Sequence, residues 1–360
     1  MGQPARQHYA TVVAGAGPAG ILAAVHAAER GPVLLAESKQ LPRSKSCGGM
    51  LHELSLATLQ EYGTVPESIV VQPRIVHFRY HDWDRGIRKQ TDLPFLNVDR
   101  AGFDEWLLTL LPANVEVLAR TRVSGFEESD DGLSIDLGIE DGACSVSTDL
   151  LIGADGARSS IRRGLGLRQS ASYVTLQDFV ELTDDIDPVF DCIYIRSIGD
   201  EFGYSYVVPK GEIALVGSVF YPRTKRPWEK QDAIISLLRE RLSGLGESTG
   251  REASAALCVR SASDVLPGAG RVLLAGEAGG FMSPTSGEGI SYALRTGRLA
   301  GLAAAGDPET ALGRYTDLVA PISHDILRRL RWLPFMESRS GKYLAGFAPR
   351  PLVSRVTQGL

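Results

Sequence analysis

A glycine-rich turn near the N-terminus constrains most strongly how this 360-residue chain can fold. The apolar segment Tyr9–Ala14 predicts a buried strand, and Ala19–Arg30 predicts a helix of small residues. Between them, Gly15 allows a tight turn, Gly17 lets a phosphate group approach the backbone, and Gly20 lets the helix pack closely on a sheet. The turn therefore predicts a diphosphate-binding site at the start of a helix.

The strand that follows supports a dinucleotide at this turn. Val33–Glu37 completes a βαβ unit, and Glu37 lies 22 residues after Gly15. A carboxylate at this place accepts hydrogen bonds from an adenosine ribose, and Ser38 lies beside it. The free N–H groups at the helix N-terminus, around Pro18 and Ala19, would face the phosphates. The unit by itself leaves NAD and FAD as alternatives.

Two further glycine-rich segments each follow a predicted strand. Gly153-Ala154-Asp155-Gly156 follows Leu150–Gly153, and Gly276–Gly280 follows Arg271–Ala275. In this order, the three segments resemble the FAD site of the p-hydroxybenzoate-hydroxylase-like flavoproteins. The resemblance implies that Asp155 and Gly156 lie by the FAD diphosphate, and that Gly276 and Glu277 bind its ribityl and diphosphate groups. Glu277 stands where that family usually has aspartate.

Four more motifs resemble the geranylgeranyl-reductase branch of that family. They are Arg43-Ser44-Lys45-Ser46-Cys47-Gly48-Gly49, Val98–Asp104, Tyr204–Gly211 and Pro284–Ile290. In the third motif Tyr206 stands where tryptophan is usual. The resemblance implies further cofactor contacts at Arg43, Cys47, Gly48, Gly49, Arg100, Pro284, Gly287, Glu288, Gly289 and Ile290. Gly287-Glu288-Gly289 opens the predicted helix Ile290–Ala305, whose N-terminus suits the negative charge that collects on a reduced flavin ring.

Three residues are candidates for catalysis. Cys47 lies near the flavin in the reductases that this chain resembles, which implies a proton-donor or substrate-contact role; a buried inert cysteine is the alternative. Tyr204 and Tyr206 are two residues apart on one predicted strand, so they share a face. That face would line a substrate pocket or form part of the core.

The remaining patterns predict a second, mostly β lobe. Alternating segments at Val115–Leu118, Val123–Glu128, Leu133–Ile139 and Cys144–Thr148, with Asp131-Gly132 and Asp141-Gly142 between the later ones, predict an antiparallel meander that returns to the strand Leu150–Gly153. Strands of another sheet are predicted at Arg74–Tyr80, Val174–Thr183, Cys192–Arg196, Tyr204–Val208 and Ile213–Phe220, followed by a helix at Trp228–Leu245.

The predicted fold class is therefore α/β. A Rossmann-like FAD-binding lobe comprises residues 1–70, 99–168 and 262–324, and contains the βαβ unit and the meander. A mostly antiparallel β lobe, residues 71–98 and 169–261, is inserted into it and is expected to bind the substrate. Residues 325–360 form a helical segment at the C-terminus.

Composition narrows the classes of partner. The net charge of −5 gives no reason to expect a nucleic-acid surface. The four cysteines are far apart, which fits a reduced cytoplasmic protein without a metal site. No apolar run is long enough to span a bilayer. Residues 325–360, however, carry seven basic and two acidic residues. This segment suits contact with the inner face of a membrane or with a partner protein, or it is a helical cap.

The sequence leaves open which reaction the flavin electrons drive. The branch resemblance implies reduction of carbon–carbon double bonds in an apolar substrate, with NAD(P)H or another reductant as electron donor. The first alternative is monooxygenation of an aromatic ring, either in a small molecule or in a peptide side chain during quinone-cofactor biogenesis. Halogenases of the superfamily carry W-x-W-x-I-P, and the four tryptophans here form no such pair. A non-catalytic flavin-binding module is the alternative from another class.

Overall fold

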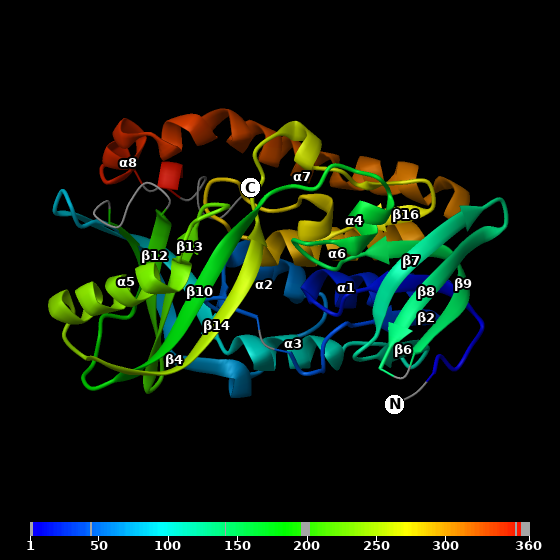
Figure 1. Cartoon of the computed structure of the whole chain (residues 1–360), viewed down its shortest axis with the longest axis horizontal. Helices are drawn as coiled ribbons and strands as arrows, with labels where there is room; N and C mark the ends of the chain where they lie inside the picture. Colours follow the sequence, from blue (N-terminus) through cyan, green and yellow to red (C-terminus); the bar gives the residue numbers. More distant parts are fainter. Residues whose placement is uncertain (1–2, 44, 141, 196–201, 350, 354–360) are drawn as a thin grey trace. The chain divides into compact units, whose positions relative to one another are not determined.

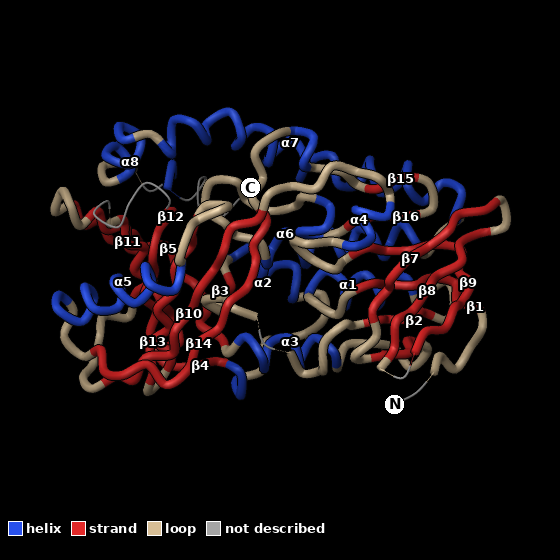
Figure 2. The backbone as a smooth tube through the Cα atoms, in the orientation of Figure 1, coloured by secondary structure: helices blue, strands red, loops and turns tan. Residues whose placement is uncertain are grey.

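The computed structural model describes residues 3–43, 45–140, 142–195, 202–349 and 351–353. The chain divides into two compact units, each built from three stretches of sequence. Unit 1 comprises residues 1–43, 104–170 and 259–331, and unit 2 comprises residues 44–103, 171–258 and 332–360. Figure 1 traces the chain through both units, and Figure 2 shows where helices and strands lie in each.

Unit 1 is built on a sheet whose central strand is the one predicted before the glycine turn. The strand order is β15-β16-β9-β1-β2-β6, and β8 joins β9 to β7. β1 pairs in parallel with both β2 and β9, and β16 pairs in parallel with β9. The strands are β1 (His8–Ala14), β2 (Val33–Ala36), β6 (Val115–Leu118), β7 (Arg122–Ser129), β8 (Gly132–Ile139), β9 (Gly142–Gly153), β15 (Gly268–Ala269) and β16 (Val272–Leu274).

Helices complete unit 1. The helix after the glycine turn, α1 (Pro18–Ala27), is buried along most of its length, since eight of its ten residues are alanine, glycine or aliphatic. It packs against α6 (Ile290–Ala304), where Gly297 and Gly301 allow close approach: a Cβ on Gly297 would lie 2.1 Å from the Ala19 carbonyl oxygen. The other helical elements are α4 (Ser160–Gly164), η3 (Ala262–Asp264), η4 (Gly276–Gly279) and α7 (Pro308–Glu337), in which the boundary between the units follows Arg331.

Two details of the predicted meander are wrong. Cys144–Thr148 and Leu150–Gly153 were predicted as separate strands, but they form one continuous strand, β9, which pairs antiparallel with β8 and parallel with β1. Val115–Leu118 was predicted as part of the meander, but β6 pairs in parallel with β2. The alternation of apolar and polar residues is the same for both kinds of pairing, so the pattern could not distinguish them. Asp141 of the second predicted hairpin lies outside the described residues.

Unit 2 is built on a long sheet of order β14-β10-β13-β12-β11-β4-β5-β3. Its neighbours pair antiparallel except β4 and β11, which are parallel. The strands are β3 (Met50–Leu51), β4 (Val70–Asp82), β5 (Ile87–Val98), β10 (Ser172–Leu182), β11 (Val189–Tyr194), β12 (Phe202–Lys210), β13 (Ile213–Phe220) and β14 (Leu245–Leu257). The helical elements are α2 (Glu53–Leu59), η1 (Glu67–Ile69), α3 (Arg100–Leu108, from which residue 104 onward belongs to unit 1), α5 (Pro227–Arg241) and α8 (Arg339–Ala345).

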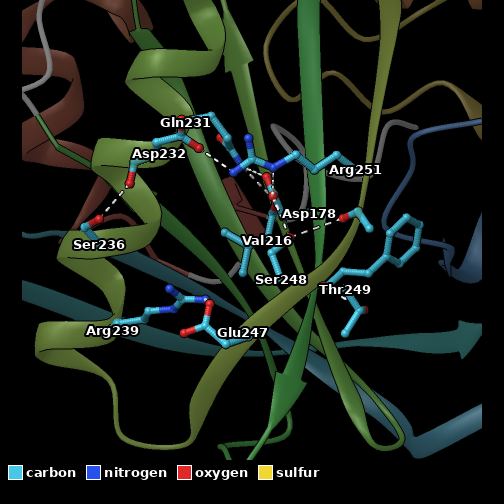
Figure 3. Close-up of polar contacts among 12 residues, drawn as sticks. Asp178, Val216, Gln231, Asp232, Ser236, Arg239, Glu247, Ser248, Thr249 and Arg251 are labelled. Atoms are coloured by element: carbon cyan, nitrogen blue, oxygen red, sulfur yellow. Dashed lines mark hydrogen bonds and ion pairs between the residues drawn. The ribbon is translucent and has the colours of Figure 1, made fainter.

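One face of the unit 2 sheet is covered by α5, and a buried carboxylate joins the two (Figure 3). Asp178 on β10 is fully buried, and its Oδ2 accepts a hydrogen bond from Gln231 Nε2 on α5 at 2.9 Å. Its Oδ1 accepts from Ser248 Oγ at 2.8 Å and from Arg251 Nε at 2.7 Å, both on β14. This network fixes helix and sheet on the face that carries none of the predicted site residues.

Several boundaries differ from those predicted. Residues 44–70 and 99–103 lie in unit 2 rather than in the nucleotide-binding lobe, and 332–360 lie in unit 2 rather than forming a separate segment. The strands β5 and β14 were not predicted. Residues 325–337 of the predicted C-terminal segment continue the long helix α7, and Arg196, predicted in a strand, is outside the described residues. No helix in the described part of the chain combines the length and apolar character needed to cross a bilayer.

Candidate functional site

The first two glycine-rich segments meet at the carboxyl ends of β1 and β9 in unit 1. Gly15 has a φ of +100°, and a Cβ there would lie 2.5 Å from the carbonyl oxygen of Ala154. A Cβ on Gly20 would lie 1.7 Å from the carbonyl oxygen of Gly15. Ligands of open α/β sheets bind at this edge, so the geometry matches the predicted phosphate turn.

The third glycine-rich segment reaches the same place. A Cβ on Gly276, whose φ is +57°, would lie 3.1 Å from the Ala19 side chain in the first turn of α1. The Gly276 amide donates to Thr296 Oγ1 on α6 at 2.9 Å, which fixes the backbone at the start of η4. Three segments separated by more than 250 residues thus converge in one unit, as the resemblance implied. Glu277 lies partly exposed on η4.

Glu37 is placed at the end of β2, buried beside the glycine turn. Its Oε2 accepts a hydrogen bond from the Ala16 amide at 2.9 Å, and its Oε1 accepts from the Lys39 amide at 2.9 Å. Ser38 Oγ donates to the same Oε1 at 3.3 Å. The carboxylate is therefore held against the phosphate turn by backbone donors, in the position predicted for the ribose contact.

Arg43 lies over the start of α1. A Cβ on Gly17 would lie 2.7 Å from Arg43 Nη2, so the guanidinium covers the residue that caps α1. Its Nη2 is 3.2 Å from Asp104 Oδ2, and its Nε is 3.8 Å from Glu37 Oε2. A helix N-terminus repels a cation, so an arginine beside it suits an anion that both can bind.

Two buried polar atoms test whether FAD fits this part of unit 1. Arg43 Nε and Asp155 Oδ1 are both buried, and neither has a hydrogen-bond partner among the described residues. The first is a charged donor next to the phosphate turn, and the second is an acceptor suited to a hydroxyl group. Leaving such groups unsatisfied costs about 1–3 kcal/mol each. A ligand with phosphates and sugar hydroxyls would satisfy both, so the residues present fit FAD.

Asp155 also has a structural role that the sequence did not reveal. Its Oδ2 accepts hydrogen bonds from the Ser160 amide at 2.6 Å, from Ser160 Oγ at 3.0 Å and from the Ile161 amide at 3.3 Å, at the N-terminus of α4. Gly156, with a φ of +81°, has no atom within 4 Å of an added Cβ. In the GADG turn, Asp155 Oδ2 is therefore held by the start of α4. Asp155 Oδ1 and the backbone at Gly156 are left for a ligand.

The loop before α6 is closed by its own side chains. Glu288 Oε1 accepts from the Ser291 amide at 2.8 Å, and Glu288 Oε2 accepts from Ser291 Oγ at 2.7 Å. The Ser283 amide donates to the Glu288 carbonyl oxygen at 2.9 Å, which closes the turn around Pro284. Glu288 thus caps α6 directly, and its carboxylate already offsets part of the positive helix end predicted to face the ring. Gly287, with a φ of +71°, Gly289, the N-cap residue, and Ile290, the first helical residue, lie as predicted.

Unit 2 brings the Cys47-Gly48-Gly49 loop to the end of β12 through Lys210. Lys210 Nζ donates to the carbonyl oxygens of Gly49 at 3.1 Å and of Val98 at 2.8 Å. Gly49 has a φ of +60°, and a Cβ there would lie 2.3 Å from the Val98 carbonyl oxygen, so only glycine fits. Burial lowers the pKa of Lys210 to about 8, and the nearby charges of Cys47 and Asp99 act in the opposite direction.

Tyr204 and Tyr206 lie close to the same thiol. Burial raises the pKa of Tyr204 and of Tyr206, and negative charge on Cys47 raises both further. Both phenols therefore remain protonated at physiological pH, so each can donate a hydrogen bond and neither can act as a base by way of a phenolate. The three candidate catalytic residues, predicted from two motifs, are thus gathered in unit 2, where the Cys47 loop meets β12.

These tyrosines belong to an aromatic face on the unit 2 sheet, which we define as Phe78, Tyr80, Phe190, Tyr194, Tyr204 and Tyr206. The ring centroids of Phe190 and Tyr206 are 5.5 Å apart, and those of Tyr80 and Tyr194 are 5.1 Å apart. The Tyr206 ring lies over Gly217 of β13, where a Cβ would come within 2.0 Å of it. Tyr206 Oη donates to Gln177 Oε1 at 3.0 Å. Tyr206 is thus held in one orientation.

Sequence reasoning missed four residues of these sites: Lys210, Asp104, Gln177 and Phe190. Lys210 lies in the quoted Tyr204–Gly211 motif, and Asp104 ends the Val98–Asp104 motif, so a signal was present for both. Gln177 and Phe190 carry no motif, and only the pairing of strands brings them to Tyr206. Arg100, predicted to bind the cofactor, is the first residue of α3 in unit 2. Among the described residues, no group of three or more His, Cys, Asp or Glu side chains is placed to hold a metal ion.

Known proteins resemble this chain over most of its length. The family described as "FAD binding domain" matches residues 8–301. Protein CbrA of Escherichia coli O9:H4 (strain HS) is 27% identical over 319 residues, which are 86% of this chain and 85% of that protein.

Two solved structures share the fold. A geranylgeranyl bacteriochlorophyll reductase-like protein from Thermoplasma acidophilum has a TM-score of 0.79 at 21% identity, covering 98% of this chain and 92% of that chain. The flavin-dependent brominase Bmp2 has a TM-score of 0.76 at 17% identity, covering 97% and 93%. These structures confirm the predicted fold class, and the family match confirms the predicted resemblance to an FAD-binding family.

Proposed function

Because this chain belongs to the FAD-binding domain family and is an FAD-dependent oxidoreductase, we propose that it reduces carbon–carbon double bonds in an apolar substrate. The observation that carries the proposal is the grouping of Cys47, Tyr204 and Tyr206 with the aromatic face of unit 2. Apolar rings with protonated hydroxyl groups bind an unsaturated chain and offer it protons, whereas they give no base for ionising a phenol substrate.

Unit 1 supplies the cofactor site in this proposal. The N-terminus of α1 and Arg43 bind the diphosphate, and Glu37 accepts hydrogen bonds from the ribose. Asp155 Oδ1 accepts from a sugar hydroxyl, because it is buried with no other partner among the described residues. A transient reductant of the NAD(P)H class restores the electrons after each turnover.

FAD held by these residues would, in its reduced form, supply an electron pair as a hydride equivalent to one carbon of the double bond. The other carbon must gain a proton, and the Cys47 thiol is the proposed donor. Lys210, charged below its pKa of about 8, then stabilises the thiolate until a proton returns from solvent. The aromatic face orients the chain and excludes water, which keeps the proton transfer directed to carbon.

Anaerobic stopped-flow spectroscopy tests this proposal. Photoreduced holoprotein is mixed with a geranylgeranyl lipid, and a fully saturated chain of the same length is the control. We expect the unsaturated lipid alone to restore the absorbance of oxidised flavin. Cys47→Ala should slow this step about 100-fold or more, as expected for the loss of a general acid. Cys144→Ala, which removes a thiol from unit 1, should leave the rate unchanged.

The opposite pattern would favour the alternative. If no unsaturated lipid reoxidises the reduced protein, and oxygen does so with hydroxylation of an added aromatic compound, the protein is a monooxygenase. A protein inert toward NAD(P)H, dithionite and oxygen alike would be a flavin-binding module without catalysis.

A further inference from the structure

The exposed large apolar side chains of the described residues gather in one short part of unit 2. Of the nine such side chains, six lie between residues 332 and 353. These six are Trp332, Phe335, Tyr343, Leu344, Phe347 and Leu352, and we refer to them as the C-terminal apolar patch. Trp332 is 61% exposed and Phe347 is 60% exposed, so the largest rings are also the most open. A cluster of exposed apolar side chains marks an interaction surface, whereas single exposed apolar side chains are ordinary on a protein surface.

The patch is continuous along the chain because α7 and α8 meet in a tight turn. The rings of Trp332 and Phe335 are 6.5 Å apart on the last turns of α7. Ser338 Oγ then accepts from the Gly341 amide at 3.0 Å, which caps α8. A Cβ on Gly341 would lie 1.9 Å from the Phe335 carbonyl oxygen, so α8 folds directly onto the end of α7. The rings of Tyr343 and Phe347 are 5.2 Å apart on the far side of this turn.

The segment is anchored on the unit 2 sheet, as Figure 1 shows for α8 above β12. Tyr80 Oη donates to the Lys342 carbonyl oxygen at 2.6 Å, and Lys342 Nζ lies 5.2 Å from the centre of the Tyr194 ring. Lys89 Nζ donates to the Ala348 carbonyl oxygen. A firmly held segment with outward-facing rings presents them without the entropic cost of ordering a free tail.

Basic residues accompany the patch. From residue 332 to the end, the sequence has four basic residues and one acidic residue. The acidic one, Glu337, accepts a hydrogen bond from Tyr221 Oη at 3.1 Å within unit 2. Arg331, whose side chain is exposed on α7 directly before Trp332, adds positive charge. The Arg85 guanidinium lies 5.2 Å from the centre of the Tyr343 ring, but Arg85 is paired with Asp82, and Arg88 is paired with Asp187. Arg329, expected to contribute, does not: it is 5% exposed and paired with Asp325.

We propose that the C-terminal apolar patch docks unit 2 on the surface of an anionic lipid bilayer. Exposed tryptophan and tyrosine rings prefer the headgroup region of a bilayer, and nearby Lys or Arg side chains are attracted to anionic lipid. The mixture of open aromatic rings and positive charge matches that surface better than it matches an apolar protein groove. The attachment is peripheral, by insertion of side chains.

Vesicle co-sedimentation of the full-length holoprotein tests the proposal. Vesicles of equal parts phosphatidylglycerol and phosphatidylcholine should bind the protein at low salt, and pure phosphatidylcholine should bind it at least tenfold more weakly. The double variant Trp332→Ser, Phe347→Ser should lose at least tenfold in affinity. Leu318→Ser, which removes a 42% exposed apolar side chain from α7 outside the patch, is the matched control and should bind as the wild type.

Other outcomes would overturn the proposal. If the wild type and the double variant bind anionic vesicles with equal affinity, charge alone explains the binding and the apolar patch takes no part in it. A dimer in light scattering that the double variant converts to a monomer would mean that a second copy covers the patch. Circular dichroism of each variant confirms that it is folded. No substrate is present in these measurements, so their failure leaves the proposed redox function untouched.

Discussion

At the scale of single residues, Lys210 is the buried charge with the clearest pH dependence. Its pKa is lowered by burial from 10.5 to about 8 in the folded protein. Between these two values the unfolded chain binds more protons than the folded chain does. The free energy of unfolding therefore rises with pH across that window, and the penalty for the buried charge is fully present below about pH 8.

We predict that Lys210→Met shifts this balance. From pH 8 to 10.5, the unfolding free energy of the wild type should rise by up to about 3 kcal/mol relative to that of the variant. Urea unfolding at several pH values measures it. A difference independent of pH would show that Lys210 has an ordinary pKa. The variant should also lower the rate of the Cys47-dependent step, because the Gly49 loop loses its anchor; Lys210→Arg should restore part of it.

Arg43 gives a second prediction at this scale. Replacing it by glutamine leaves Glu37 and Asp104 beside the phosphate turn without their cation, and they would repel a diphosphate. Titration of the apoprotein with FAD, followed by flavin fluorescence, should show a dissociation constant about 10- to 100-fold higher. Arg120→Gln removes a charge from an exposed ion pair with Glu140 in the same unit and should leave the affinity unchanged. Equal affinities in all three proteins would mean that Arg43 does not contact the cofactor.

Motifs predicted which residues lie near one another better than they predicted the local structural role of each residue. Cys47, Tyr204 and Tyr206 were found because each stands in a motif, and unit 2 brings them together. The capping roles of Asp155 and Glu288 were not foreseen, because an acidic side chain near a helix start serves equally as a cap or as a ligand. Only the contacts of Asp155 and Glu288 show which role each has. These contacts depend on backbone dihedral angles in the turn, which cannot be read from the sequence.

At the scale of elements, the first turn of α1 depends on two glycines that touch. Gly20→Ala would place a methyl group 1.7 Å from the Gly15 carbonyl oxygen, and backbone cannot yield by that much locally. We expect a loss of about 2 kcal/mol or more in stability, together with weakened FAD binding.

A second glycine serves as the matched control. Gly313 lies within α7, and a Cβ there meets no atom within 4 Å. Gly313→Ala should therefore stabilise the protein by about 1 kcal/mol through helix propensity alone. Thermal unfolding of the two variants measures both changes in stability. An equally mild effect at both positions would contradict the close packing of the phosphate turn.

Elements with strong periodicity were predicted well, and elements stabilised by strand pairing were missed. Residues 213–220 and 115–118 were predicted with the bounds that the structure has. β14 was missed because Leu245–Leu257 is rich in glycine, serine and alanine, and its place follows from pairing with β10. β5 contains Pro94, which argues against a strand when the sequence is read alone. Its long pairing with β4 outweighs that local preference.

At the scale of the whole molecule, the chain crosses between the two units several times, so neither unit is a continuous stretch of sequence. Unit 1 carries the three glycine-rich segments, and unit 2 carries the Cys47 loop and the aromatic face. The family match covers both, which is why the cofactor could be predicted from motifs alone. The substrate could not, since the aromatic face is assembled from strands whose residues carry no shared motif.

The measurement that tests the central claim most directly is the mass of the product after a single turnover. Reduced holoprotein is mixed with a geranylgeranyl lipid once under argon and once under ¹⁸O-labelled oxygen. The account predicts a product that gains a pair of hydrogen atoms for each reduced double bond under argon, and that contains no labelled oxygen in either case. A product that forms only with oxygen and carries the ¹⁸O label would contradict it.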